Sequence, residues 1–404
     1  MAPDRLDVNG APTRRARVAI AAVFLTNGAL FANLLPRYPE IKTDLTMSNA
    51  LYGAAVASFS AGALLAGLTA AAMIRRFRSA PVALVTTYLL AGFLVAAAAA
   101  PSPALFAAAL FVAGASDAVT DVAQNVNGLR LQRHYGRSII NSLHAVWALG
   151  AILGGLMGAT AIALDVPRTA HLGVAAVVFC IVVTVAYRDL LKGPDHEQHP
   201  SAATSGRRER HPAVYLSLLV LVLIAIAGIT VEDAGNTWAT LYLRDSLGAP
   251  AAVAPMGYVA LVTFMFIGRV TGDRLVDRFG ERAVVRCGGL LAATGMGAAL
   301  AFPSVPLTIV GFALAGLGVA TVVPAAMRAA DELPGLRAGT GLTILSWLMR
   351  GGLLGAPLLV GVIADATSLR LGLLTVPVAG VALVALAGAL SAPRRRAPSR
   401  RHLQ

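Results

Sequence analysis

The chain has 404 residues, of which 57% are hydrophobic and only 13% are charged. A soluble domain carries about 25% charged residues, so this composition excludes a water-soluble globular protein and predicts that lipid covers much of the surface. The formal net charge of +13 would suggest nucleic acid in a soluble chain, but its distribution along the chain assigns it to membrane topology, and we expect no nucleic-acid partner.

Twelve apolar stretches, each long enough to cross a bilayer, follow one another along the chain. A spanning helix needs about 20 apolar residues. Runs of this length occur at 17–36, 51–74, 81–100, 104–127, 139–164, 170–187, 213–238, 252–272, 284–302, 307–327, 340–364 and 372–390. The sequence therefore predicts an all-α membrane protein with twelve transmembrane helices in two six-helix bundles related by a pseudo-two-fold repeat.

A polar segment rich in Pro, His, Ser and Arg separates the two sets of six spans. It predicts five parts: a cytoplasmic N-terminal tail at 1–16, a first bundle at 17–187, a cytoplasmic linker at 188–212, a second bundle at 213–390 and a basic cytoplasmic tail at 391–404.

Basic residues are distributed unequally between the two sides of the predicted membrane. Most of the 33 Lys and Arg residues lie in the tails, the linker and the loops of one side, whereas the opposite loops hold only Arg37, Lys42, Arg168, Arg244 and Arg370. Basic loops face the cytoplasm. We therefore expect a multi-pass protein of the bacterial inner membrane with both termini cytoplasmic, in contact with membrane lipid.

Polar and ionisable residues inside the spans are the main functional signal. A charged side chain at the bilayer centre costs ~2.5–3.5 kcal/mol on an insertion scale, so it needs a partner, a neutral form or a water-filled cavity. In the first span, Asn27 and Asn33 are candidate hydrogen-bond donors to such a cavity.

The fourth span carries the strongest polar cluster. Asp117, Asp121 and Asn125 recur at every fourth position, so they share one helix face. This pattern predicts a cavity wall that binds the substrate and a proton. The alternative is that these side chains form hydrogen bonds between helices and hold the bundle together.

The fifth span begins with a polar segment that contains His144 and Trp147. Antiparallel packing of spans four and five would bring His144 near Asp121 or Asn125, where it could relay protons. A hydrogen bond that only packs the helices is the alternative. Both residues are assigned to the candidate substrate and proton pathway.

The seventh span ends in an acidic and amide-containing segment. Glu232 is a candidate proton or substrate site, and Asn236 lies one helical turn further on. Trp238 and Tyr242 follow, and aromatic residues near a span end usually anchor it at the membrane interface.

An internal repeat supports the division into two halves. The segments Ile74–Arg78 and Val276–Arg282 follow the second and eighth spans, and Arg76 and Arg278 are 202 residues apart. Parallel repeats of this kind are a known transporter plan, in which the substrate site lies between the halves.

Residues 273–282, Asp-Arg-Leu-Val-Asp-Arg-Phe-Gly-Glu-Arg, resemble the cytoplasmic loop signature Gly-x-x-x-Asp-Arg-x-Gly-x-Arg of the major facilitator superfamily. Asp273 stands where the first Gly is expected. In the first-half copy, Arg75 replaces the Asp and Arg78 replaces the second Gly. With the twelve spans and the middle loop, this resemblance covers the whole chain and implies the transporter fold of that family.

The same resemblance implies that this loop is a latch that holds one conformation. Asp277 would pair with Arg278, Arg282 or Arg328, or cap a neighbouring helix. The alternative is a solvated surface turn with weak ion pairs.

Three further segments resemble a sugar-permease-like bacterial branch, related to the fucose permeases. They are the runs 121–125 and 144–147 and the spacing of Glu232 and Trp238. Thr237 departs from that pattern because the branch often has Asp at this position. This resemblance does not fix a substrate.

The eleventh span contains Arg350, about thirteen residues from its start, or roughly 20 Å at 1.5 Å per residue. This depth is too great for easy snorkelling to the cytoplasm. We expect either a buried carboxylate partner, with Asp117 or Glu232 as candidates, or an anionic group of the substrate.

These features predict a secondary active transporter, not an enzyme, which moves a small polar solute by alternating access and is coupled to protons. Export of a drug or secondary metabolite by the same fold is the alternative, although Gly155 stands where drug exporters have Pro. An intramembrane enzyme or a transport-derived sensor is a weaker third. No phosphate-binding loop or metal-ligand cluster occurs in the sequence, so we expect no cofactor and no metal, and we expect a monomer.

Overall fold

The computed structural model describes residues 11–135, 139–192, 212–333, 336 and 340–390, and within these ranges the chain is helical without strands. The expectations for residues 1–10 of the first tail, for 193–211 of the linker and for the tail 391–404 lie outside the described residues.

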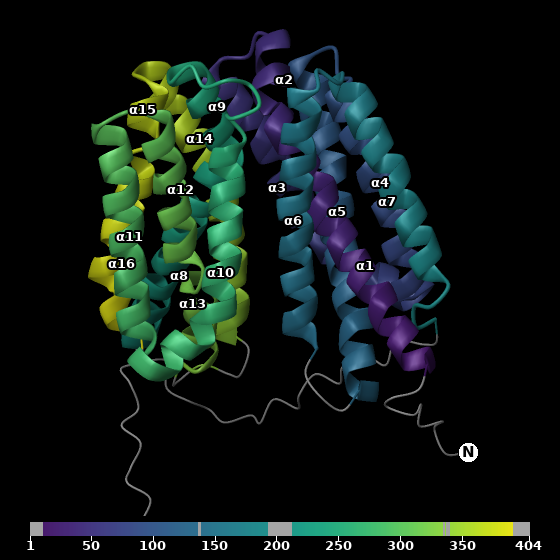
Figure 1. The fold of residues 1–404 in the computed structure, drawn as a ribbon. Coiled ribbons are helices and arrows are strands. Elements are labelled where there is room, and N and C mark those ends of the chain that lie inside the picture. Colours follow the sequence, from purple (N-terminus) through teal and green to yellow (C-terminus); the bar gives the residue numbers. More distant parts are fainter. Residues whose placement is uncertain (1–10, 136–138, 193–211, 334–335, 337–339, 391–404) are drawn as a thin grey trace, which may run out of the picture.

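The first bundle contains six long helices and one short helix (Figure 1). Helix α1 packs against α6 and α7, α3 packs against α5, and α4 packs against α5 and α7. The helices are α1 (Ala11–Leu34), α2 (Tyr38–Asp44), α3 (Asn49–Phe77), α4 (Ser79–Ala98), α5 (Pro103–Tyr135), α6 (Ile140–Ala163) and α7 (Arg168–Tyr187).

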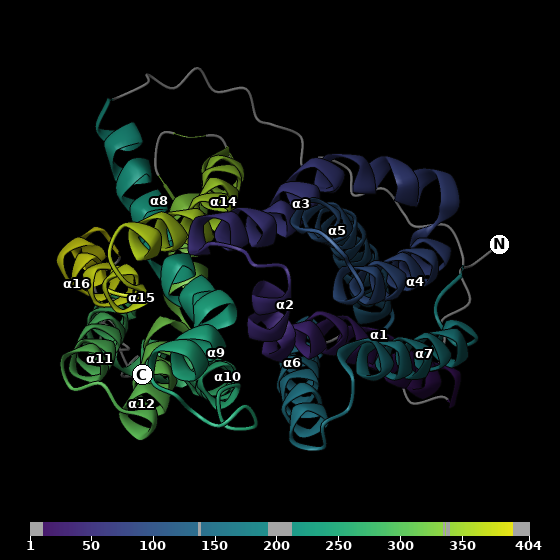
Figure 2. The same cartoon turned by 90° about the horizontal axis from the view of Figure 1, so that it is seen from above.

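The second bundle lies beside the first (Figure 2). Helix α12 packs between α10 and α11, while α8 packs against α13, α14 and α16. The helices are α8 (Pro212–Asp233), α9 (Ala239–Leu241), α10 (Met256–Phe279), α11 (Glu281–Ala301), α12 (Val305–Val319), α13 (Val322–Asp331), α14 (Thr340–Ala366), α15 (Leu369–Gly372) and α16 (Thr375–Leu386).

Within the described ranges, 11 helical segments are long and apolar enough to cross a membrane. Helix α10 takes the remaining place in the predicted set of twelve. Its 24 residues are long enough, but its second half is crowded with the charged residues Arg269, Asp273, Arg274, Asp277 and Arg278. The predicted all-α architecture of two bundles is therefore confirmed.

Glycines allow the helices within each bundle to approach closely. A Cβ atom at Gly62 would lie 1.9 Å from the carbonyl oxygen of Phe111, and one at Gly114 would lie 1.9 Å from that of Phe59. Lipid provides no hydrophobic driving force between helices, so close van der Waals packing at small residues helps to hold them together. These positions explain why α3 and α5 pack along much of their length.

The two bundles repeat each other at the spacing of 202 residues seen in the sequence. Helix α3 ends at Arg78 with φ 71° and ψ 155°, and α10 ends at Gly280 with φ 83° and ψ 153°. Glycine adopts this positive-φ conformation easily, whereas a non-glycine residue is strained in it. Arg78 thus keeps the backbone geometry of the repeat although the glycine itself has been replaced.

A second pair of arginines confirms the repeat on the opposite side of the bundles. Arg168 Nε donates to the carbonyl oxygen of Ala98 at 2.7 Å, and Arg370 Nε donates to that of Leu300 at 2.7 Å. Each arginine lies 202 residues from its counterpart, as do the two carbonyl groups. The halves therefore share detailed helix-end contacts as well as helix order.

Contacts between the bundles gather on one side of the molecule. We call the side where α1 begins the terminal side and the side where α3 begins the far side (Figure 1). The Tyr52 hydroxyl donates to the backbone oxygen of Thr237 at 2.8 Å, and the Tyr52 ring meets that of Trp238 edge to face at 5.1 Å. A Cβ at Gly53 would lie 2.4 Å from the carbonyl oxygen of Pro357. The far side is therefore closed by packing of α3 against α14 and the end of the α8 segment.

An exposed carboxylate completes the far-side closure. Asp365, at the end of α14, accepts hydrogen bonds from the backbone N–H groups of Asn49 at 2.8 Å and Ala50 at 2.7 Å. These N–H groups begin α3, so a negative charge of the second bundle caps a helix of the first. Carboxylates at helix N-termini are stabilising by about 0.3–1 kcal/mol when exposed.

We predict that Asp365→Asn weakens the closure of the far side. Loss of the charge should raise the fraction of molecules open on that side by about two- to fivefold. Spin labels at the exposed positions Thr43 and Thr367, one on each bundle, would report this as a larger population of long distances. Asp165→Asn, an exposed far-side carboxylate, is the matched control. An unchanged distance distribution in Asp365→Asn would show that this cap does not hold the bundles together.

Candidate functional site

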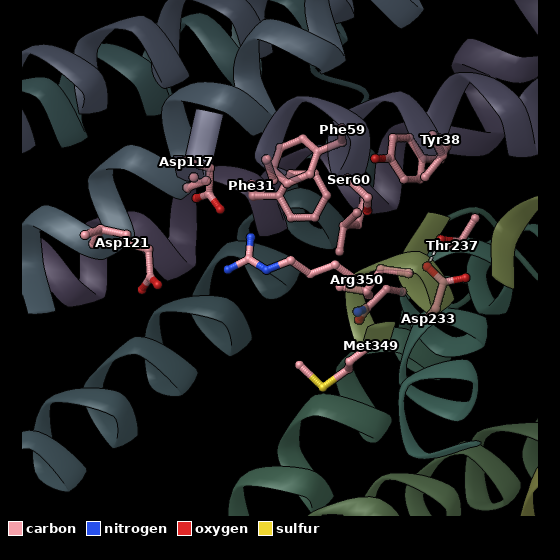
Figure 3. Close-up of a pocket in the computed structure, with 18 residues that line it drawn as sticks. Phe31, Tyr38, Phe59, Ser60, Asp117, Asp121, Asp233, Thr237, Met349 and Arg350 are labelled. Atoms are coloured by element: carbon pink, nitrogen blue, oxygen red, sulfur yellow. Dashed lines mark hydrogen bonds between the residues drawn. The ribbon is translucent and has the colours of Figure 1, made fainter. Parts of the chain in front are cut away.

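A cavity of about 390 Å³ lies between the two bundles, within the size range of small-molecule sites. Helices α1, α2, α3 and α5 line it from the first bundle, and the end of the α8 segment and α14 line it from the second. Figure 3 shows its polar and aromatic lining. The lining residues are Phe31, Leu35, Tyr38, Val56, Phe59, Ser60, Ala63, Gly67, Asp117, Ala118, Asp121, Val122, Asp233, Asn236, Thr237, Met349, Arg350 and Leu353.

Asp117 belongs to a hydrogen-bonded group that joins α1, α5 and α6. Asn27 Nδ2 donates to Asp117 Oδ1 at 2.7 Å. The amide oxygen of Asn27 in turn accepts from Trp147 Nε1 at 2.8 Å and from Gln124 Nε2 at 3.3 Å. Asn27 is thus the centre of the group and orients the carboxylate of Asp117 at the cavity wall.

Asp121 continues the same group toward the terminal side. Its Oδ1 accepts from Gln124 Nε2 at 3.2 Å and from Asn125 Nδ2 at 3.0 Å. His144 Nε2 lies 3.2 Å from Asn125 Oδ1, and the His144 side chain is exposed. The sequence-predicted residues Asp117, Asp121, Asn125 and His144 are therefore linked by hydrogen bonds that also need Asn27 and Gln124, because no direct bond joins Asp117 to Asp121. This chain of hydrogen bonds runs from the cavity to an exposed imidazole.

Arg350 enters the cavity from α14 of the second bundle. Figure 3 shows its guanidinium group pointing across the cavity toward Asp117 and Asp121. Among the described residues it forms neither a hydrogen bond nor an ion pair. The sequence offered Glu232 as a partner, but Glu232 lies 3.8 Å from the guanidinium of Arg269 on α10 instead.

Asp233, the neighbour of Glu232, is the acidic residue of this segment that lines the cavity. Its Oδ1 accepts from the Thr237 hydroxyl at 3.1 Å. Its Oδ2 is buried without a hydrogen-bond partner in the described part of the chain, as is the hydroxyl of Tyr38. Both residues line the closed, far-side end of the cavity.

A π-helical turn at Ala234–Trp238 follows α8 directly. It contains Asn236 and Thr237, both of which line the cavity. Single π-helical turns within longer helices often occur at functional sites because they change the direction of the side chains that follow. Asp233, Asn236 and Thr237 are spaced i, i+3 and i+4, so they share one face of this segment and line one cavity.

The remaining predicted pathway residues lie in different surroundings. Asn33 is fully buried, and its amide oxygen lies 2.9 Å from His171 Nε2. It packs α1 against α7 and does not line the cavity. Trp238 and Tyr242 are also buried, with exposed fractions of 0% and 1%, whereas the sequence suggested interfacial anchors. The far-side contact between the bundles covers Trp238.

The expected latch residues meet different partners in the structure. Arg328 Nε donates to Glu281 Oε1 at 2.9 Å, and Arg282 donates to the backbone oxygens of Gly388 and Leu390. Asp277 is exposed and makes no hydrogen bond or ion pair with another described residue. The guanidinium of Arg278 lies over the ring of Phe279 at 5.3 Å. These contacts stay within the second bundle.

Metal binding is not indicated by the geometry. Within the described ranges, no three His, Cys, Asp or Glu side chains are grouped as a metal ion would require.

Sequence analysis did not assign Gln124, Tyr38 or Asp233 to the site. Gln124 lies between Asp121 and Asn125 in the sequence, and its distance of three residues from Asp121 is a helical contact distance. Asp233 carried the same intramembrane signal as Glu232, and which of the two faces the cavity depends on the rotation of α8, which the sequence does not display. Tyr38 had no signal, because it follows the first span in a short segment.

The chain matches a protein-family model and is similar to a transporter along most of its length. The model described as Major Facilitator Superfamily matches residues 20–275 and 264–404. An uncharacterised transporter, y4wD, of Sinorhizobium fredii is 30% identical over 365 residues, which cover 87% of this chain and 92% of the relative.

Solved structures share the fold at low sequence identity. The nucleoside transporter NupG covers 94% of this chain and 98% of its own, with a TM-score of 0.71 and 13% identity. A D-xylose-proton symporter covers 93% and 96%, with a TM-score of 0.70 and 13% identity. FucP in the outward conformation covers 92% and 97%, with a TM-score of 0.59 and 16% identity. At these identities the likeness shows the shared fold alone. It adds no support for the resemblance to the sugar-permease-like branch.

We predict that Asn27→Ala destabilises the first bundle. The substitution removes three hydrogen bonds that converge on one buried amide. Side-chain hydrogen bonds between membrane helices are worth roughly 0.6 kcal/mol on average, and unpaired buried groups add a desolvation cost, so a loss of about 1–3 kcal/mol is expected.

Equilibrium unfolding of the purified protein in detergent micelles would measure this loss. Asn236→Ala is the control, since Asn236 lines the same cavity but makes no hydrogen bond with another described residue. Equal stability of the two variants would contradict the central place of Asn27.

Proposed function

Because the chain belongs to the Major Facilitator Superfamily and is a secondary transporter of that fold, we propose that it moves a small polar solute across the membrane by alternating access, coupled to protons. The observation that carries the proposal is the cavity between the bundles. It is lined by three carboxylates and an arginine, Asp117, Asp121, Asp233 and Arg350.

The distribution of contacts supports alternating access. The bundles, proposed as the units 17–187 and 213–390, meet on the far side through Tyr52, Thr237 and Asp365. His144, near the terminal side, is exposed and is joined to the cavity by hydrogen bonds. We infer that this conformation opens toward the terminal side and that rocking of the bundles would break the far-side contacts and open the opposite end.

The terminal side is proposed to be cytoplasmic, in the bacterial inner membrane. Arginines concentrate in the segments on that side, and basic loops stay in the cytoplasm. On this orientation the conformation is inward-facing. We further propose that the protein works as a monomer, because each chain has both halves and its own cavity.

Proton coupling is supported by the hydrogen bonds that link Asp117 to Asp121 through Asn27 and Gln124, and Asp121 to His144 through Asn125. A carboxyl group binds a proton more tightly when its surroundings lose water, and releases it when water or a cation returns. Opening the cavity alternately to each side would change the hydration of Asp117 and Asp121 in this way. The D-xylose-proton symporter named among the similar structures shows that the fold is compatible with such coupling.

Export of a partly apolar metabolite by the same mechanism is the second candidate. Phe31 and Phe59 stack at 4.3 Å between ring centroids, and together with Leu35, Val56 and Leu353 they give the cavity an apolar wall. This wall favours a solute with a hydrocarbon face as well as polar groups.

We predict solute flux in proteoliposomes that responds to a pH gradient. One pH unit corresponds to about 1.4 kcal/mol, or a tenfold concentration ratio at steady state if one proton is coupled to one solute. A panel of labelled sugars, organic acids, amines and drugs, with and without a gradient, would measure this ratio.

In the same assay, Asp121→Asn and Asp117→Asn test the proton carrier. At least one of them should equilibrate the solute without accumulating it, since an amide carries no exchangeable charge. Asp165→Asn, outside the cavity, should behave as the wild type. Undiminished accumulation in both cavity variants would exclude these two residues as the coupling site.

A further inference from the structure

Arg350 is the unsatisfied cation of the cavity. Among the described residues that line it, Arg350 is the only basic one, and its guanidinium has no hydrogen-bond or ion-pair partner in the described part of the chain. A guanidinium group offers five N–H donors in a rigid fork, and a planar carboxylate is the acceptor that matches this fork best. The N–H donors of Arg350 therefore lack an acceptor from the described part of the protein in this conformation, and a ligand could provide one.

The nearby carboxylates already have partners within their own bundle. Asp117 accepts from Asn27, and Asp121 accepts from Gln124 and from Asn125. These amides fix the two carboxylates against α1 and α5, so neither comes within ion-pair distance of Arg350.

Two further groups at the closed end also lack partners. Asp233 Oδ2 and the Tyr38 hydroxyl are buried without a hydrogen bond among the described residues, and both residues line the cavity. Figure 3 shows Tyr38 and Asp233 at the end opposite the guanidinium of Arg350. A buried polar group without a partner is unfavourable because it has lost its hydrogen bonds to water. A ligand that donates a hydrogen bond at this end would remove that cost.

We propose that the cavity binds a small solute with one carboxylate, which pairs with Arg350, and with a hydroxyl or ammonium group that donates to Asp233 and Tyr38. A hydroxy acid or an amino acid has this chemistry. The stacked rings of Phe31 and Phe59 would contact the carbon skeleton between the two polar ends. This inference rests on the proposed transport function and names the solute class for it.

The acidic residues of the cavity favour a carboxylate over a more highly charged anion. Asp117, Asp121 and Asp233 line the same cavity as the single guanidinium, and like charges at close range in a poorly solvated site repel one another strongly. A phosphate dianion would bring a second negative charge with no second cation to meet it. A purely cationic solute would satisfy the acidic groups but leave Arg350 without an acceptor.

Thermal stabilisation of the purified protein by matched solutes tests this proposal without knowledge of the natural substrate. Two series compare carboxylates with analogues that lack the carboxylate or carry a phosphate: D-glucose, D-glucuronate, D-glucosamine and D-glucose 6-phosphate, and serinol, L-serine and O-phosphoserine, all at equal ionic strength. A bound ligand stabilises the folded protein in proportion to the logarithm of its concentration over its Kd. We expect D-glucuronate or L-serine to stabilise at lower concentration than every member of the same series that lacks a carboxylate or carries a phosphate.

Substitutions at Arg350 then assign the effect to this residue. Arg350→Gln should weaken the carboxylate response by about tenfold or more, because a charge-assisted pair is replaced by a neutral hydrogen bond. Arg350→Lys should keep part of the response. Arg274→Gln, which removes an exposed arginine of α10, is the control and should respond as the wild type. If Arg350→Gln does not fold, the wild-type series and Arg350→Lys still decide the question.

Different results would contradict the solute class and the transport function. A preference for neutral, amine or phosphate members, an absence of any carboxylate response, or a carboxylate response that Arg350→Gln retains in full would overturn the solute class. Flux of a neutral or cationic solute in proteoliposomes, equal in wild type and Arg350→Gln, would overturn it too while leaving the transport function intact. Carboxylate binding through Arg350 without any flux would instead contradict transport and keep the assigned ligand chemistry.

Discussion

Charged and amide side chains are costly in contact with lipid, and this constraint organises the whole molecule. At several positions, polar side chains within the spans meet another helix or line the central cavity. The clearest case is α5, where Asp117, Gln124 and Asn125 turn inward and meet α1 and α6 through Asn27 and His144. The apolar residues of the outer helices, by contrast, remain exposed, as a surface against lipid requires.

The two bundles meet this constraint differently, although they repeat one another. The first bundle satisfies its carboxylates with its own amides. The second bundle leaves Arg350 and one oxygen of Asp233 facing the cavity without a partner among the described residues. Such an asymmetric arrangement suits a carrier. The polar groups of the first bundle are already hydrogen-bonded, whereas Arg350 and Asp233 of the second bundle would be satisfied only by a bound solute. Closure of the far side by Asp365 and Tyr52 keeps this cavity from being a channel.

Much of this arrangement follows from local sequence spacing. The fourfold spacing of Asp117, Asp121 and Asn125 predicted a common face, and antiparallel packing predicted the approach of His144 to Asn125. The repeat of 202 residues predicted two halves, and both the helix ends and the arginine contacts follow it. These features depend on helix periodicity and short connections, which a sequence displays directly.

Local residue spacing could not predict features that depend on helix rotation or on contacts between residues far apart in the sequence. Asn27 and Asn33 lie on the same span, yet only Asn27 reaches the cavity group. Six residues make about one and two-thirds helical turns, so the two side chains point in directions roughly 120° apart. The choice between Glu232 and Asp233 likewise depends on rotation and on the π-helical turn that follows. The cap of Asp365 on Asn49 joins residues 316 positions apart, and no local pattern announces it.

The most direct test of a sheltered aqueous cavity is labelling of single cysteines with a membrane-impermeant maleimide, after Cys180 and Cys287 are replaced by Ser. Ala63 and Ala118 line the cavity, whereas Val85 on α4 is an exposed apolar residue suited to face lipid. The account predicts that cysteines at 63 and 118 react from the terminal side in oriented membranes and that one at 85 does not. Reaction at 85 together with protection at 63 and 118 would contradict it.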